Sequence, residues 1–201
     1  MVLSNLDLLL WIAAPSLSIL CWLLCPKRHG AIREYLLFCC LRDIIQFMVW
    51  KDGSQAAYFH MYWLFQAISF LLQMVIISKL ISESGLGLWP ALIAMAATIF
   101  MPQSGHPGAV VYVVASLQRA IYAGRMAALA IVWLKQNDLS PLSREILTGF
   151  GLMAGVELAV AWVKAHFGIF GNANLNHLQI GFFLVMLCWW FAAFWREKYA
   201  E

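Results

Sequence analysis

Charged side chains are scarce in this chain. They make up 11% of its 201 residues, against about 25% in soluble domains, whereas hydrophobic residues make up 63%. A soluble globule of this composition would have too few polar side chains to cover its surface. The chain also lacks the polar and apolar alternation of membrane β-barrels. Both absences predict an all-α transmembrane helix bundle, with the lipid bilayer as its surroundings.

Several signatures of activity are missing as well. The sequence has no phosphate-binding glycine loop, nucleophile elbow or dinucleotide fingerprint. The net charge of +3 is small and falls mainly on one side of the predicted spans, which indicates topology and anionic-lipid contact and no nucleic-acid partner. The last predicted span, 175–195, holds no lysine for a Schiff base, so we expect no retinal cofactor.

Long apolar runs divide the chain into seven predicted spans. Seven helices of about 20 residues use about 140 residues, so we expect one transmembrane domain, 1–201, and no soluble domain. The fourth span is the shortest and covers only about 24 Å at 1.5 Å per residue. The predicted spans are about 6–24, 32–50, 58–81, 86–101, 109–134, 145–167 and 175–195.

The basic residues predict the orientation of these spans. The loops after the first, third and fifth predicted spans and the C-terminal tail carry eight Lys and Arg residues, whereas the loops on the opposite side hold only Lys51 and Lys164. Because cytoplasmic loops carry the excess of Lys and Arg, we expect the N-terminus outside, the C-terminus in the cytoplasm and a multi-pass protein of the inner (plasma) membrane. All five cysteines fall in the middle or inner half of their helices, so disulfides are not expected. The residues that set this orientation are Lys27, Arg28, Arg33, Lys79, Lys135, Arg144, Arg196 and Lys198.

Polar side chains recur in the middle of four predicted spans. Each ionisable group costs about 2.5–3.5 kcal/mol in hydrocarbon, so each needs a partner, a water-filled cavity or a function. In the third span, four polar residues follow one another at steps of four, three and four positions and therefore share one helix face: Tyr62, Gln66, Ser69 and Gln73. The candidate ligand-binding residues are Arg42, Asp43, Gln66, Gln73, Gln118, Arg119, Tyr122, Arg125 and Glu157.

Counting residues from the span ends places Arg119 and Glu157 at similar depth, so we predict that they form an ion pair. Three arginines and two carboxylates then share one level, and one positive charge is left over. That surplus indicates a solvated cavity or an anionic ligand. The alternative is that these groups only cross-link helices, beside a Gly151 and Gly155 face that lets a neighbouring helix approach.

Four histidines fall on the predicted outer face. Neutral imidazole is a common metal ligand, so the group is a candidate zinc site, or a pH sensor. The alternative is that these histidines cap helices or bind loops at the interface. Membrane zinc hydrolases of the ceramidase and adiponectin-receptor type carry paired histidines on one helix, and that motif is missing here. The four residues are His60, His106, His166 and His177.

Two stretches, Arg33–Phe38 and Tyr58–Ala67, carry a resemblance to known proteins. They are similar to segments of a group of uncharacterised bacterial seven-helix integral membrane proteins. The resemblance covers the second and third predicted spans. It implies an architecture and no activity.

Our leading hypothesis is a sensor, receptor or transporter that binds a small polar or anionic ligand in the bundle. Arg119 would anchor the ligand and Glu157 would hold or release Arg119, while Gln66, Gln73 and Gln118 would donate hydrogen bonds. The absence of a convincing internal repeat favours sensing over transport. Two alternatives stay open, an intramembrane metal-dependent hydrolase that uses the outer histidines and a non-catalytic structural subunit. A homo-oligomer and a cytoplasmic partner are both compatible with the sequence.

Overall fold

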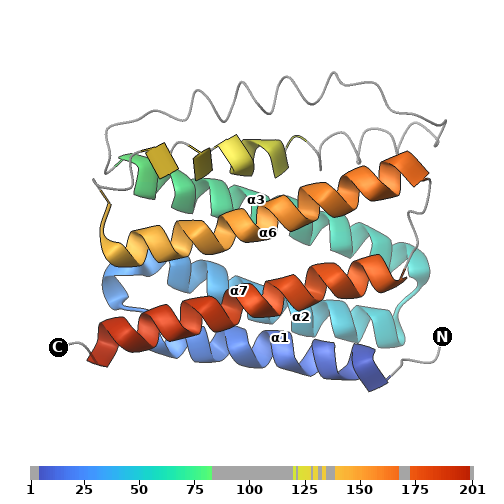
Figure 1. Ribbon diagram of the computed structural model, residues 1–201. Helices are drawn as coiled ribbons and strands as arrows, with labels where there is room; N and C mark the ends of the chain where they lie inside the picture. The colour runs from blue at the N-terminus through green and yellow to red at the C-terminus, as the bar shows by residue number, and fades with distance from the viewer. Residues whose placement is uncertain are drawn as a thin grey trace. The chain divides into compact units, whose positions relative to one another are not determined.

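The computed structural model describes residues 5–82, 120, 122–127, 129–130, 133–134, 139–167 and 173–199. Within these ranges all the regular structure is helical, which confirms the predicted all-α class. Figure 1 shows the long helices as coiled ribbons. They are α1 (Asn5–Leu24), α2 (Gly30–Asp52), α3 (Gln55–Ser82), α6 (Pro141–Phe167) and α7 (Ala173–Tyr199), with the 3₁₀ turn η1 (Lys27–His29) between α1 and α2.

Four of these helices are long and apolar enough to cross a membrane: Leu6–Leu24, Ala56–Ile77, Pro141–Lys164 and Asn174–Tyr199. They coincide with the predicted spans 6–24, 58–81, 145–167 and 175–195 to within a few residues. Large apolar side chains stay exposed on their surfaces, among them Leu9, Ile12, Leu71 and Trp162. A surface of this kind fits a lipid environment and not water.

The second predicted span, 32–50, behaves differently. Residues 30–52 form one continuous helix, α2, but this helix is not among the candidate spans. Charged residues lie near both of its ends and in its middle, and they lower its mean hydropathy. The fourth predicted span, 86–101, lies outside the described residues, and the fifth, 109–134, is described only in part, where 122–127 are helical.

The described chain forms two compact units. The first contains α1, α2, α3 up to Ile76, and α7 from Phe183 onward. In this unit α1 packs against α2 as an antiparallel hairpin (Figure 1). Pro26 disfavours helix in the residue before it, so α1 ends there and η1 turns the chain into α2. The thiol of Cys21 donates a 3.3 Å hydrogen bond to the carbonyl of Leu187 on α7.

The core of the first unit is largely aromatic and aliphatic. Tyr35 meets Trp190 edge to ring, with centroids 6.4 Å apart, and Phe38 meets Phe65 at 6.0 Å. Trp190 is fully buried. Edge-to-face contacts at these distances favour one arrangement of the rings. They fix the rotation of α2 toward α3 and α7, and with it the direction of the polar residues on α2.

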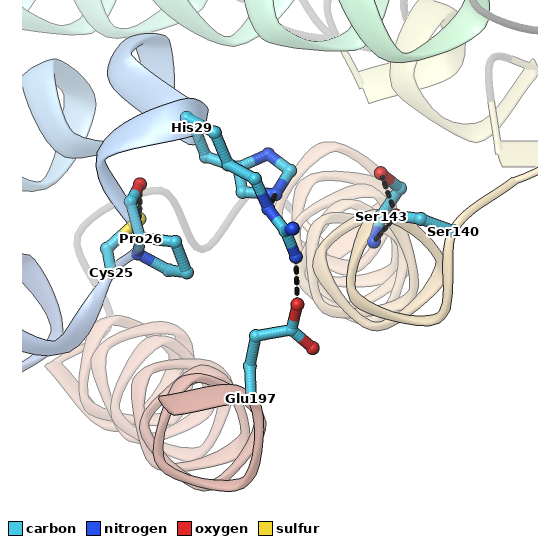
Figure 2. Close-up of polar contacts among 7 residues, drawn as sticks. Cys25, Pro26, His29, Ser140, Ser143 and Glu197 are labelled. Carbon is cyan, nitrogen blue, oxygen red and sulfur yellow. Dashed lines mark hydrogen bonds and ion pairs between the residues drawn. The ribbon is translucent and has the colours of Figure 1, made fainter. Parts of the chain in front are cut away.

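The second unit spans Ile77–Phe182, and its best described element is α6. Ser140 caps this helix: its hydroxyl accepts a 3.2 Å hydrogen bond from the backbone N–H of Ser143, as Figure 2 shows. Pro141 follows at the first helical position, where its missing N–H has no partner to lose. The buried face of α6 includes Ile146, Leu147 and Phe150.

Candidate functional site

The polar residues of α3 form the face that their spacing predicted. The amide of Gln66 donates a 3.2 Å hydrogen bond to the hydroxyl of Tyr62, one turn away. The amide of Gln73 donates to the hydroxyl of Ser69 at 3.1 Å and to that of Tyr35 on α2 at 2.7 Å. Ser69 and Gln73 are buried. This face of α3 is therefore turned toward α2 and joined to it by hydrogen bonds.

Arg42 and Asp43 form a buried ion pair in the middle of α2. Arg42 donates from Nε to Oδ1 of Asp43 at 2.8 Å, and its Nη2 lies 2.7 Å from the same oxygen. The guanidinium also lies over the ring of Phe183 on α7, 5.6 Å from the centroid. The guanidinium of Arg42 thus contacts a carboxylate and an aromatic face, and both contacts stabilise a desolvated cation.

More polar groups surround this pair. Tyr58 of α3 interacts electrostatically with both Arg42 and Asp43, and Tyr62 lies close to Tyr58, with ring centroids 6.5 Å apart. Gln46, one turn beyond Arg42 on α2, is buried. Residues of α2 and α3 therefore contribute to one polar cluster. We call Arg42, Asp43, Gln46, Tyr58 and Tyr62 the α2 cluster.

Near the contact between α2 and α3, two buried side-chain oxygen atoms accept no hydrogen bond from the described residues. Asp43 is 6% exposed, and its Oδ2 has no hydrogen-bond partner among the described residues. Gln73 is 4% exposed, and within the same described ranges its Oε1 is unpartnered too. A buried acceptor without a donor costs about 1–3 kcal/mol. Both positions therefore favour an incoming group that donates a hydrogen bond.

The second unit holds a different buried ion pair. Nη1 of Arg125 donates a charged hydrogen bond to Oε2 of Glu157 on α6. Arg125 is 3% exposed. The sequence predicted Arg119 as the partner of Glu157, with Arg125 in the same cluster. The structure gives Glu157 the partner Arg125, whereas Arg119 and Gln118 lie outside the described residues, and the predicted Arg119 contact stays a prediction.

The glycines of α6 face the segment that carries this arginine. A Cβ on Gly151 would meet the side chain of Leu129 at 2.5 Å, and one on Gly155 would lie 3.7 Å from the sulfur of Met126. The ring of Tyr122 is 5.5 Å from the guanidinium of Arg125. The segment that carries Arg125 therefore runs directly along the small-residue face of α6.

Sequence reasoning missed two polar contacts. Lys164 donates from Nζ to the amide oxygens of Asn176 at 2.8 Å and Gln179 at 3.3 Å, across the end of α6 and the start of α7. Arg28 forms an ion pair with Glu197. The only sequence signal for the first contact is that Lys164 and Asn176 lie at facing ends of consecutive predicted spans.

The described histidines make local contacts. Nδ1 of His60 donates a 2.7 Å hydrogen bond to the carbonyl of Ala56. The ring of His166 stacks on Trp162 with centroids 5.1 Å apart. No three His, Cys, Asp or Glu side chains gather around a metal position within the described ranges, which include His177. His106 lies outside those ranges, so the four-histidine site stays a prediction.

The five cysteines are free thiols. Cys25 follows the last residue of α1, and burial raises the pKa of its thiol to about 12, although Arg33 opposes this rise. A thiol with this pKa stays protonated and unreactive at neutral pH. Cys25 is therefore a packing residue of the α1 and α2 turn.

No protein-family model, curated protein or solved structure matches the chain. The function is consequently argued from the two buried ion pairs and their surroundings. Of these, only the α2 cluster combines a charged pair, half-buried hydroxyl groups of α3, a buried amide of α2 and an unpartnered carboxylate oxygen within the described residues. It is the best candidate site.

Proposed function

We propose that the chain is a multi-pass protein of the inner (plasma) membrane that binds a small polar or anionic molecule inside its helix bundle, as a sensor, receptor or transporter. In this proposal the chain has seven spans, with the N-terminus outside and the C-terminus in the cytoplasm. The four apolar helices support membrane insertion. The distribution of Lys and Arg supports the orientation.

The unpartnered Oδ2 of Asp43 carries the ligand proposal. This oxygen belongs to a charged, buried side chain whose other oxygen already accepts two contacts from Arg42. A hydroxyl or amino group of a ligand would donate to Oδ2, and an anionic group on the same ligand would interact with the guanidinium of Arg42. The α2 cluster thus favours a small molecule that carries both kinds of group, such as a hydroxy acid or an amino acid.

The charge balance supports an anionic component. The sequence places three arginines and two carboxylates in the middle of the spans, and the structure pairs Arg42 with Asp43 and Arg125 with Glu157. Arg119 is the remaining arginine of the predicted set. In our proposal Arg119 supplies the charge that attracts an anionic ligand. Sensing is favoured over transport because the sequence shows no related halves.

A ligand-dependent stability measurement tests this proposal. The full chain is purified in detergent, and its thermal unfolding is followed with amino acids, hydroxy acids and dicarboxylates added one at a time. A ligand at 100 times its dissociation constant stabilises the folded state by about 2.7 kcal/mol. We expect at least one compound to raise the unfolding temperature of the wild type.

Two double variants identify the binding site. Arg42→Gln with Asp43→Asn removes both charges of the α2 cluster together, so no buried charge is left unpaired. Arg28→Gln with Glu197→Gln removes a more exposed ion pair of the same unit and serves as the matched control. We expect the first variant to lose the ligand effect and the second to keep it. If no compound stabilises the wild type and the first variant has a wild-type cellular phenotype, the structural-subunit alternative is favoured.

A further inference from the structure

The C-terminal end of α7 carries an open groove of about 470 Å³. Its lining is apolar except for one cation: Phe191, Ala192 and Trp195 form the surface, and Arg196 borders it. All four residues belong to the first unit and to the part of α7 that lies within a candidate membrane span. An apolar surface that ends at a guanidinium is complementary to a lipid, whose apolar acyl chains end at a charged headgroup.

Aromatic rings follow the same side of α7. Phe191 stacks on Trp195 with centroids 6.0 Å apart, and Trp195 lies 4.6 Å from Tyr199. These residues are four positions apart, so their rings form one line along the helix. Trp195 is 48% exposed. Exposed Trp and Tyr near the end of an apolar helix are typical of the level where acyl chains meet headgroups.

Basic side chains gather at this end of the unit. Lys198 and Arg196 lie in the last turn of α7, and the ion pair between Arg28 and Glu197 joins the α1 and α2 turn to that last turn (Figure 2). Among the described residues, this end of the unit therefore combines an excess of positive charge with the groove. The side chains counted are the cations Lys27, Arg28, Arg33, Arg196 and Lys198 and the carboxylates Glu34 and Glu197.

We propose that the groove binds one anionic phospholipid, with an acyl chain along Phe191, Ala192 and Trp195 and the phosphate at Arg196. The positive charge of this end favours an anionic over a zwitterionic headgroup. The site rests on the proposed topology in one respect, namely that this end of α7 lies at the cytoplasmic surface of the membrane. Its residues are separate from the α2 cluster, so it is a second binding site with a different ligand.

Native mass spectrometry of the full chain in detergent tests the lipid site. The protein is titrated with phosphatidylglycerol and, separately, with phosphatidylcholine, and bound lipids are counted from the mass of the complex. We expect phosphatidylglycerol to bind more tightly. Since one basic residue contributes about 1 kcal/mol to attraction of anionic lipid, Arg196→Gln should weaken phosphatidylglycerol binding about fivefold. Phosphatidylcholine binding should weaken less, because its choline cation offsets the charge of the phosphate.

Lys51→Gln is the matched control, because it removes an exposed lysine from the C-terminal end of α2, which is the end away from η1 and the groove. We expect this variant to bind both lipids like the wild type. Trp195→Ala should weaken both lipids, since it removes the apolar surface. Equal effects of Arg196→Gln and Lys51→Gln, or equal binding of the two lipids to the wild type, would overturn the lipid site. Neither result bears on the ligand proposal, whose variants lie at Arg42 and Asp43.

Discussion

The Arg42–Asp43 pair joins two neighbouring residues of one helix, whereas the Arg125–Glu157 pair joins residues 32 positions apart on two segments. The first pair cannot hold helices together by itself, and it leaves Oδ2 of Asp43 without a partner in the described residues. The second pair connects α6 to the segment that packs on Gly151 and Gly155. In our proposal these similar charges therefore serve different purposes in the two units.

We use this difference between the two ion pairs to distinguish a binding role from a structural role. A charge pair that cross-links helices offsets part of its desolvation by fixing the packing of those helices. A pair within one helix offers no such gain, so its burial favours a function. We therefore propose that the α2 cluster binds the ligand and that the Arg125–Glu157 pair serves packing. Stability measurements on variants of both pairs test this proposal.

The largest effect is expected for Glu157→Leu. This change leaves the guanidinium of Arg125, which is 3% exposed, buried without its carboxylate. Removing one partner of a buried ion pair costs about 3–5 kcal/mol, and replacing both partners by apolar residues is often nearly neutral. We expect Glu157→Leu to be destabilised by that amount in a denaturant titration in detergent. The double variant Arg125→Leu with Glu157→Leu should regain most of the loss, and a double variant as unstable as the single one would contradict a simple packing role.

Asp43→Asn should have a smaller effect. Arg42 loses its counterion but keeps the aromatic face of Phe183, and the amide oxygen of the substituted side chain can still accept a hydrogen bond. We expect a loss of about 1–3 kcal/mol in the same titration. A loss equal to that of Glu157→Leu would show that the α2 pair is as important for packing as the interhelical pair, and the comparison would fail.

Helix faces could be predicted from the sequence, but contacts between distant segments could not. The steps of four, three and four residues placed Tyr62, Gln66, Ser69 and Gln73 on one side of α3, because helical periodicity is a local property. Depth counting placed Glu157 with the arginines in the middle of the spans, and the structure pairs it with Arg125. Depth alone does not decide between Arg119 and Arg125 as partners of Glu157, since six residues are less than two helical turns and neighbouring helices slide and tilt. The predicted Arg119 contact lies outside the described residues.

Helix α2 also shows that the sequence does not predict contacts between distant segments. Its length and its continuity as a helix follow from the sequence, yet the charges that mark it as a candidate site also make it the least apolar of the described long helices. Hydropathy alone cannot separate a polar helix inside a bundle from a helix outside the membrane. Burial of Tyr35, Leu36 and Cys39 against neighbouring helices is tertiary information, and only the structure supplies it.

Gly151→Ala and Gly155→Ala form a matched pair that tests the packing side of the comparison. The new methyl group at 151 would meet Leu129 at 2.5 Å and force its side chain to move, whereas the one at 155 has ordinary contact with Met126 at 3.7 Å. We expect Gly151→Ala to lose about 1 kcal/mol, at the low end of overpacking effects. Gly155→Ala should be neutral or slightly stabilising, since Ala favours helix over Gly. If both variants behave alike, the segment does not approach α6 as closely as we infer.

The smallest effect is expected for Lys164→Met, which removes a cation that binds two neutral amides instead of a carboxylate. The hydrogen bonds to Asn176 and Gln179 join α6 to α7, but interhelical polar contacts in membrane proteins contribute only about 0.6 kcal/mol on average. Methionine keeps most of the apolar stem, so packing changes little. Lys51→Met, at an exposed position of α2, is the control and should leave the unfolding free energy unchanged. A loss at Lys164 as large as that at Glu157 would mean that amide partners stabilise a half-buried cation as well as a carboxylate stabilises a buried one. The charge of Glu157 would then no longer explain the strength of the interhelical pair.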